Sequence, residues 1–203
     1  MVTYTKNTRE IIYNTQMNEF GFYFVADELS LDFSNTLIGS PTAITNTDFL
    51  ENPKRLHDWY ISANLMTAND SRESAFKSAL ELRSTLHEMY WNLQGNNSIA
   101  NTTLEKFNGF LEQRRERLQI RSEGISFVLE CLIENQPDPV FQIAESAAYF
   151  LANLERNRLK KCSNPNCNFL FYDRSKNNSR RWCDMQTCGN RAKQTRFRLE
   201  NEA

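Results

Sequence analysis

Four of the five cysteines in this chain of 203 residues lie within one short segment, and this clustering limits what that segment can fold into. They form two pairs, with four residues inside each pair and fifteen between the pairs: Cys162, Cys167, Cys183 and Cys188. Two pairs spaced in this way fold back on each other when four thiolates bind one tetrahedral Zn²⁺ at about 2.3 Å. Since all four ligands are cysteines, no position is left for water, and the pattern favours one structural zinc ion over a catalytic one. Disulfide bonds and iron are the alternatives that the spacing leaves open.

The residues around the cysteines predict a small finger that depends on its metal. About 40 residues cannot bury enough apolar surface to fold alone, so metal binding, worth roughly 10 to 16 kcal/mol, is expected to supply most of the stability. Residues 169–172 predict a strand, with Arg181 and Trp182 on the returning strand. From Met185 onward we expect a helix whose N-terminal N–H groups donate to the sulfurs of the second pair. Trp182 is expected to pack over the zinc site.

The net charge of −1 hides a separation of charge along the chain. Residues 156–198 contain twelve Lys and Arg and two acidic residues, which gives a net charge of +10. The rest of the chain contains twelve Lys and Arg and 23 acidic residues, which gives a net charge of −11. A concentrated positive face attracts phosphates whatever the other end of the molecule carries. We therefore expect DNA binding, with Arg191 as the preferred phosphate contact and with these candidate residues: Arg174, Lys176, Arg180, Arg181, Asn190, Arg191, Lys193, Arg196 and Arg198.

The sequence leaves other roles open for the same lysines and arginines. They can neutralise the thiolates, cap the C-terminus of a helix, or dock onto the acidic N-terminal part of the chain. The alternative function is a zinc-stabilised module without DNA specificity, whose partner is RNA or an acidic protein. The acidic part can also repel DNA or cover the basic segment until a signal frees it. A homodimer is a further expectation, because two-fold DNA sites match two-fold proteins.

The N-terminal part predicts a mainly helical domain. Phe22–Val25 predicts a short strand that leads into a helix, and residues 118–121 and 125–132 predict a hairpin. Asp32 and Asn35, polar residues in an apolar stretch, either line a pocket or form local caps and turns. Apolar stripes with helical spacing predict four further helices, three of them preceded by cap residues or capping boxes. They begin near Pro53, Asp70, Thr102 and Pro139.

The expected fold class is therefore α+β: a mainly helical N-terminal domain with short strands or a hairpin, followed by a C-terminal four-cysteine finger that resembles a zinc ribbon. A change of composition divides the chain into a polar tail at 1–19, the helical domain at 20–155 and the finger at 156–203. No apolar run approaches the ~20 residues that span a bilayer, and the tail lacks the apolar segment of a secretory signal. We expect a cytoplasmic protein, not bound to a membrane, whose thiols are kept reduced.

No pattern in the sequence is typical of an enzyme. The two histidines, His57 and His87, lie on predicted helices among core residues, without a recognisable nucleophile or carboxylate arrangement. No glycine-rich phosphate loop, nucleophile elbow or zinc-hydrolase motif is present. We therefore expect a binding protein with no catalytic residues.

Two stretches resemble known families. Residues 183–193, CDMQTCGNRAK, resemble the bacterial CGNR zinc finger, and residues 29–37, LSLDFSNTL, resemble the opening signature of the ABATE domain. The resemblance implies a transcription regulator in which the four cysteines bind zinc and the finger binds DNA. It also implies that the helical domain senses stress or an unidentified small-molecule effector. Gly189 is expected in a tight turn after the last ligand, and Asn190 either at the cap of the following helix or on a phosphate.

Overall fold

The computed structural model describes residues 17–41, 47–65, 73–112, 116–123, 126–133 and 138–201. Within these ranges the fold class is as predicted, with helices, short antiparallel strand pairs and four clustered cysteines in the C-terminal part. Most of the expected tail at 1–19 and the expected helix start at Asp70 lie outside the described residues. No helix in the described ranges has both the length and the apolar character needed to cross a membrane.

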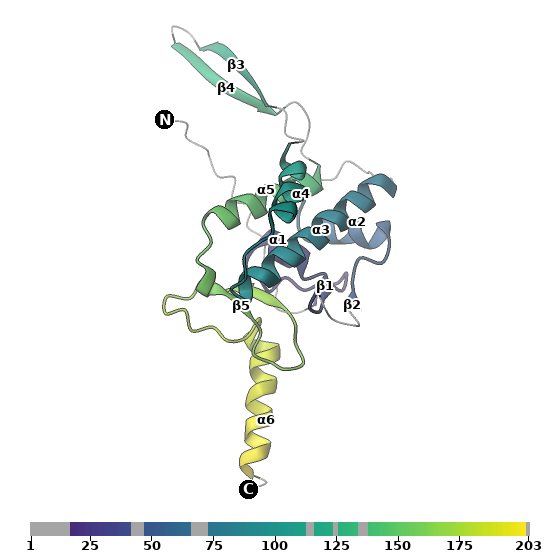
Figure 1. Ribbon diagram of the computed structural model, residues 1–203, viewed down its shortest axis with the longest axis vertical. Coiled ribbons are helices and arrows are strands. Elements are labelled where there is room, and N and C mark those ends of the chain that lie inside the picture. Colours follow the sequence, from purple (N-terminus) through teal and green to yellow (C-terminus); the bar gives the residue numbers. More distant parts are fainter. Residues whose placement is uncertain are drawn as a thin grey trace.

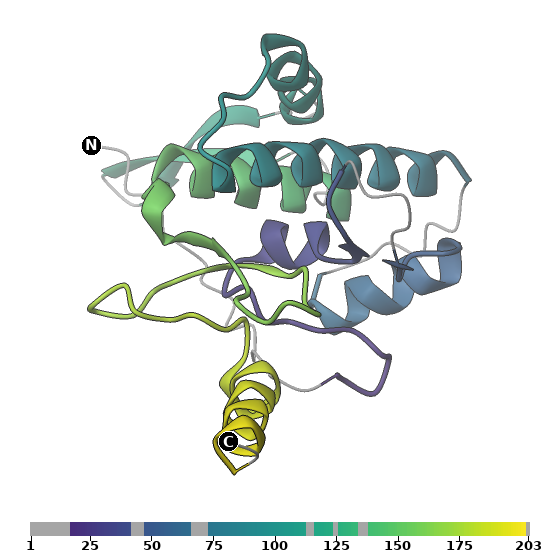
Figure 2. The same ribbon diagram turned by 60° about the horizontal axis from the view of Figure 1, so that its bottom comes forward.

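In the described part of the chain, a body of five helices surrounds the core: α1 (Leu29–Ser34), α2 (Pro53–Ser62), α3 (Glu73–Gln94), α4 (Asn101–Leu111) and α5 (Pro139–Ala152). Helices α3 and α5 lie side by side, α1 packs beneath both, and α4 covers them from the other side (Figure 2). The apolar stripes of these helices meet in one core, where Leu31, Trp59, Tyr90 and Ile143 are fully buried. The core thereby fixes the position of α1 and of the segment that leads into it.

Two helices begin where the sequence predicts them, and each has a side-chain cap. Oδ1 of Asn52 accepts the N–H of Arg55 (3.0 Å) at the start of α2, and Oδ1 of Asp138 accepts the N–H of Val140 (2.9 Å) at the start of α5. A proline fills one of the first positions of each helix, where its missing N–H costs no hydrogen bond. The predicted starts near Pro53 and Pro139 are thus confirmed.

The predicted capping box at the start of α4 is not formed. The helix begins at Asn101, the preceding Ala100 takes the cap position, and no side chain there bonds the free N–H groups. Thr102 therefore lies inside the helix and not before it. The next hydroxyl, that of Thr103, donates to Oε1 of Glu88 on α3 (2.8 Å), so packing between the two helices outweighs the local cap signal.

The strand predicted at Phe22–Val25 is also wrong, although the helix predicted after it is present as α1. These residues pair with no strand in the described ranges. The ring of Phe24 stacks on that of Trp59 with centroids 5.7 Å apart, while Val25 is buried beside the cysteine cluster. The N–H of Val25 donates to Oδ1 of Asp32 (2.9 Å), which takes the place of a neighbouring strand.

Three antiparallel strand pairs complete the described structure: β1 (Leu37–Ile38) with β2 (Thr47–Asp48), β3 (Glu116–Glu123) with β4 (Ser126–Ile133), and β5 (Leu159–Lys161) with β6 (Leu170–Tyr172). The β3–β4 pair confirms the predicted hairpin. It extends from one end of the body, and the last helix, α6 (Asn190–Asn201), extends from the opposite end (Figure 1). The β5–β6 pair lies between the body and α6.

A buried histidine makes the stability of the helical body depend on pH. His87 of α3 is 4% exposed, and its Nδ1 lies 3.5 Å from Oγ of Ser34. Burial lowers the pKa of His87; contacts with the backbone of Gly39 and Ser34 oppose this shift, and the nearby Arg83 guanidinium adds to it. The unfolded chain, with a histidine pKa near 6.5, therefore takes up a proton at a higher pH than the folded chain. Stability is full above about pH 6.5 and falls as the pH drops toward the lowered pKa.

We expect the His87→Gln variant to lose this decrease in stability on the acid side. For one group the decrease is at most about 1.4 kcal/mol of unfolding free energy per pH unit. Urea unfolding just above and just below about pH 6.5 measures the slope. Wild type and variant share their cysteines, so the difference between their slopes isolates His87, and His57→Gln is the matched control. A slope that is the same in wild type and His87→Gln would assign the pH dependence to another group.

Candidate metal centre and basic surface

The first cysteine pair is held by the β5–β6 hairpin. The sequence predicted the wrong partner for β6. β6 pairs along its whole length with β5, and not with the segment at Arg181 and Trp182. The N–H of Cys162, the residue after β5, extends this ladder by donating to the carbonyl of Phe169 (3.0 Å). The carbonyl of Arg181 accepts the N–H of Ser163 (2.9 Å), so the returning segment is tied to the turn between the first two cysteines.

Asn164 shapes the first pair and connects it to the second. Its carbonyl accepts the N–H of Cys167 (2.9 Å), and its Oδ1 accepts the N–H of Asn166 (3.0 Å), which closes the turn between the two cysteines. Its Nδ2 lies 3.4 Å from Sγ of Cys188 and donates to that sulfur. The bond to sulfur was not predicted from the sequence, because Cys188 is 24 residues away.

The second cysteine pair lies at the beginning of a helix, as predicted. Cys183 precedes Asp184, whose Oδ1 accepts the N–H of Thr187 (2.7 Å) as a helix cap. A π-helical turn over Met185–Gly189 contains Cys188 and continues into α6. The cap of this helix is therefore the buried carboxylate of Asp184.

The structure contradicts the tight turn expected at Gly189 and the cap expected at Asn190, while contact of Asn190 with a phosphate stays a prediction. Gly189 is helical and not in a tight turn; a Cβ there would overlap Sδ of Met185 and lie 3.2 Å from Cδ1 of Trp182. A side chain at this position would force Met185, and to a lesser extent Trp182, to move. Asn190 is not the cap, since its Nδ2 donates back to the carbonyl of Gln186 (2.9 Å).

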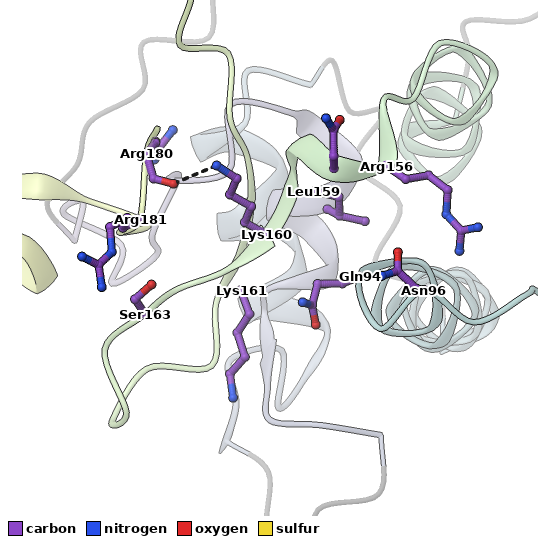
Figure 3. A pocket seen from close by; sticks show the side chains of 10 residues that line it. Gln94, Asn96, Arg156, Leu159, Lys160, Lys161, Ser163, Arg180 and Arg181 are labelled. Carbon is purple, nitrogen blue, oxygen red and sulfur yellow. Dashed lines mark hydrogen bonds between the residues drawn. The ribbon is translucent and has the colours of Figure 1, made fainter. Parts of the chain in front are cut away.

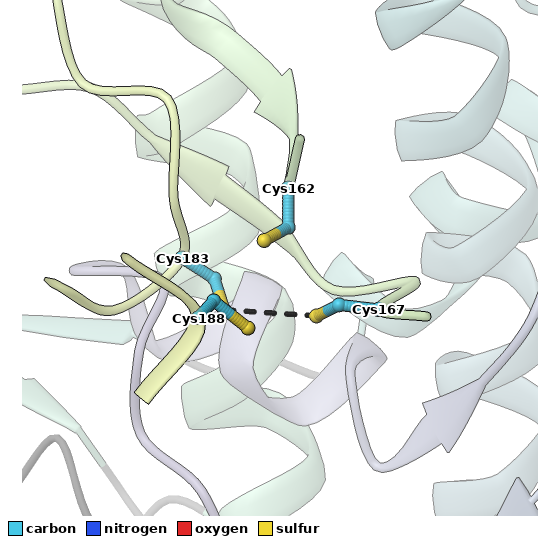
Figure 4. A group of neighbouring side chains, drawn as sticks. All are labelled: Cys162, Cys167, Cys183 and Cys188. Atoms are coloured by element: carbon cyan, nitrogen blue, oxygen red, sulfur yellow. Dashed lines mark hydrogen bonds between the residues drawn. The ribbon is translucent and has the colours of Figure 1, made fainter. Parts of the chain in front are cut away.

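The four sulfurs converge on one point (Figure 4), with all ligand atoms within 4.8 Å of one another. Sγ of Cys183 lies 3.7 Å from that of Cys167 and 3.8 Å from that of Cys188. A tetrahedron with metal–sulfur bonds of about 2.3 Å has edges of about 3.8 Å, so the observed separations fit a tetrahedral metal site. A disulfide bond requires about 2.05 Å, and all four thiols are free.

The clustered thiols shift one another's pKa values. Hydrogen bonds from the Cys167 and Cys183 thiols lower the pKa of Cys162 to about 2. The hydrogen bond with Cys162 raises the pKa of Cys167 to about 12 and also raises that of Cys183. The Cys162 thiolate thus makes deprotonation of these two neighbouring thiols harder. The backbone N–H groups of Cys183 and Asn164 also stabilise the Cys162 thiolate.

The metal centre lies in a second, smaller core at the seam between finger and body. The sulfurs of Cys162, Cys183 and Cys188 are buried with Phe169 and Phe171, and Trp182 packs against this cluster as predicted. Val25, Tyr23 and Ile38 contribute to the same core from the N-terminal part of the chain. Conversely, Leu159, Leu170 and Tyr172 of the finger belong to the core of the helical body.

Asp32 forms local turn contacts, which was one of the two interpretations open for it, whereas Asn35 bonds a strand that is distant in the sequence, which neither interpretation anticipated. Nδ2 of Asn35 donates to the carbonyl of Leu170 (2.8 Å), and its Oδ1 accepts the N–H of the same residue (3.1 Å). Oδ1 of Asp32 accepts the N–H groups of Val25 and Ala26 (both 2.9 Å). Burial raises the pKa of Asp32 well above its usual range, although these two N–H groups oppose the shift. The two side chains shape the segment on which β6 docks.

Two of the basic residues predicted to bind DNA are used inside the molecule. The guanidinium group of Arg180 pairs with the carboxylate of Asp27 and donates to the carbonyls of Val25 (2.8 Å) and Cys183. Nη2 of Arg174 donates to the carbonyl of Asp27 (2.9 Å). Docking onto the acidic N-terminal part, the alternative use of these bases, thus describes both arginines.

Other predicted contact residues are exposed. This group has no ion pair within the described ranges and comprises Lys176, Arg181, Arg191, Lys193 and Arg198. The last three lie on α6, which extends away from the body, so the body does not cover them (Figure 2). Arg196 is also on α6, but its side chain is not among those that the structure describes.

Comparison with known families gives two matches along the chain. Residues 27–153 match the ABATE family model, described as "Putative stress-induced transcription regulator", and residues 158–199 match the model of the CGNR zinc finger. The resemblance seen in the motifs is confirmed, in the same order along the chain. Both models describe regulatory or zinc-finger families and not enzymes. No match was found among curated proteins.

Proposed function

This chain belongs to the ABATE family and carries a CGNR zinc finger, and from that premise we propose that it is a zinc-dependent, DNA-binding regulator of transcription. Cys162, Cys167, Cys183 and Cys188 hold one structural Zn²⁺, which neutralises the thiolates and joins the two cysteine pairs. Helix α6 contacts DNA. The helical body modulates the finger through the seam at which the two cores meet.

Helix α6 is the feature that carries this proposal. It extends from one end of the body (Figure 1), packs mainly against the π-helical turn before it, and exposes Arg191, Lys193 and Arg198. A polar helix whose described side chains are mostly exposed gains little from packing within its own chain, so a partner surface explains why it projects. Its twelve residues span about 18 Å, and one helix fits the major groove of DNA, which is about 12 Å wide.

The order of side chains around α6 suits a helix inserted in a groove. At about 100° per residue, Arg191 and Arg198 lie on one flank and Lys193 on the other, roughly 160° around the axis. Gln194 and Phe197 lie between the flanks, and Phe197 is 68% exposed. We propose that the flanking arginines and lysine contact DNA phosphates. The two central residues contact the edges of the DNA bases. Glutamine pairs with adenine in the major groove, and phenylalanine contacts the thymine methyl group.

The double variant Arg191→Ala with Arg198→Ala is expected to bind duplex DNA more weakly whatever its sequence. The slope of log affinity against log salt should fall by about 2 in magnitude, because two phosphate contacts are lost. Gln194→Ala is expected to keep the slope and to relax sequence preference, at a cost of about 1–3 kcal/mol in binding free energy at the preferred site. Fluorescence anisotropy between about 50 and 200 mM salt measures both effects. Lys106→Ala, at an exposed base on α4, is the matched control.

Selection of nucleic acid from mixed random pools of DNA and RNA, with the zinc-loaded full chain, identifies the partner. Enrichment of duplex DNA supports the proposal. Enrichment of RNA, or of no nucleic acid, contradicts it and favours the module that binds RNA or protein. Zinc content is measured for every variant, so that loss of binding is not confused with loss of the folded finger.

A further inference from the structure

A cleft at the seam between the helical body and the finger collects positive charge. Its volume is about 440 Å³, and it is lined by the end of α3 on one side and by β5 and the segment around Arg181 on the other (Figure 3). Small-molecule sites have volumes of about 300–1,000 Å³, so the cleft is large enough for one such ligand. None of its lining residues is acidic and five are basic: Arg156, Lys160, Lys161, Arg180 and Arg181.

Two of these five charges are already neutralised by carboxylates. Nζ of Lys160 lies 2.7 Å from Oδ2 of the buried Asp173, and it also donates to the carbonyl of Arg180 (3.1 Å), as Figure 3 shows. Arg180 is itself paired with Asp27. The remaining three have no acidic partner among the described residues: Arg156, Lys161 and Arg181. Since two of the five basic side chains that line the cleft are paired with carboxylates, the cleft keeps a net charge of +3.

Each of the three unpaired cations is nevertheless held in position. Nη2 of Arg156 donates to a backbone carbonyl just after α3 (2.5 Å). Nζ of Lys161 lies 5.5 Å from the ring centroid of Trp91, and the guanidinium group of Arg181 lies 5.5 Å from that of Trp182. The contacts with a carbonyl and two rings restrain the side chains without cancelling their charge. Cations that are restrained before binding lose less conformational freedom when an anion arrives.

We propose that this cleft binds a small molecule that carries two or more phosphate groups. Each phosphate monoester carries about −1.5 to −2 at pH 7, so two phosphates balance the three unpaired cations. Guanidinium groups match the geometry of phosphate oxygens, and Gln94, Asn157 and Ser163 add neutral polar groups to the lining. Because body and finger both line the cleft, such a ligand contacts the two together. The site is separate from α6, and the proposal does not depend on DNA binding.

Inorganic pyrophosphate titrated into the zinc-loaded full chain at low salt tests the proposal. We expect binding in calorimetry and a change in tryptophan fluorescence, because Trp91 and Trp182 lie beneath two of the cations, whereas Trp59 is buried in the body. Lys161→Ala and Arg181→Ala should each weaken binding about tenfold, through loss of one charge-assisted contact. Lys176→Ala, at an exposed base of the finger outside the cleft, should bind as wild type does.

Either of two results overturns the proposal: no binding by wild type at millimolar pyrophosphate, or equal affinity in wild type and the two cleft variants. Duplex DNA provides the second arm. Loss of duplex affinity in Lys161→Ala and Arg181→Ala, with no pyrophosphate binding by wild type, would assign these cations to the DNA backbone. Zinc content measured before and after titration separates ligand binding from removal of the metal by pyrophosphate.

Discussion

Replacing Cys183 with serine is expected to abolish zinc binding and to unfold the finger, while the helical body stays folded. The change removes one of four sulfurs that lie within 4.8 Å of one another, at a position buried inside the second core. Metal binding in zinc-finger peptides is worth roughly 10 to 16 kcal/mol, which is comparable with the stability of an entire domain, about 5–15 kcal/mol. The core of the body, by contrast, consists mainly of apolar side chains from five helices. We therefore expect unfolding in two steps.

Elemental analysis and hydrogen exchange check this expectation. Wild type should contain one zinc per chain, and Cys183→Ser close to none, with fast exchange of the N–H groups at 162–189 and protection retained in α3 and α5. Removal of zinc from wild type by a chelator should give the same exchange pattern. Cys131→Ser, at the fifth cysteine, lies in β4 at the other end of the molecule and is the matched control (Figure 1). A variant that kept a full equivalent of zinc would show that the four-cysteine site is wrongly assigned.

Local signals in the sequence were sufficient wherever neighbouring residues determine the structure. Asn52 followed by Pro53, and Asp138 followed by a proline, start helices through contacts two or three residues away. The spacing of the cysteines likewise predicted a cluster, because each pair closes a short turn. Thr102 failed as a cap because packing of α4 against α3 set the start of that helix.

Contacts between distant parts of the chain could not be predicted from the sequence. β6 was expected to pair with Arg181 and Trp182, but the segment before Cys162 already occupies its edge. The bases of the finger also look alike in sequence, yet Arg180 is held by Asp27, 153 residues away, while Arg191 is exposed. Only the tertiary structure separates docking arginines from those open to a partner.

The position of the seam bears on how the finger can be studied. Leu159, Leu170 and Tyr172 are buried in the core of the helical body, and Val25 is buried beside the cysteines. A fragment of residues 156–203 would expose the first three side chains and would lack the fourth. We infer that body and finger fold against each other, so tests of DNA binding are best made on the full chain.

The amide of Asn35 is the most direct test of this seam, and Asn35→Ala is expected to lower the free energy of unfolding by about 3 kcal/mol. The side chain is buried, and it satisfies both the N–H and the carbonyl of Leu170 in β6, 135 residues away. Each buried backbone group left without a partner costs about 1–3 kcal/mol. Urea unfolding of the zinc-loaded proteins measures the loss.

Zinc content and hydrogen exchange separate this effect from damage to the metal centre. Asn35→Ala leaves all four cysteines in place, so it should retain one zinc per chain and show faster exchange at 170–172. Asn108→Ala, at an exposed position on α4, is the matched control and should change stability by less than about 0.5 kcal/mol. If the two variants were equally stable, the hydrogen bonds of Asn35 would not hold the finger to the body, and docking would rest on Arg180 and the shared apolar cores. If instead Asn35→Ala lost its zinc, the metal site itself would depend on docking, and the two cores would form one cooperative unit.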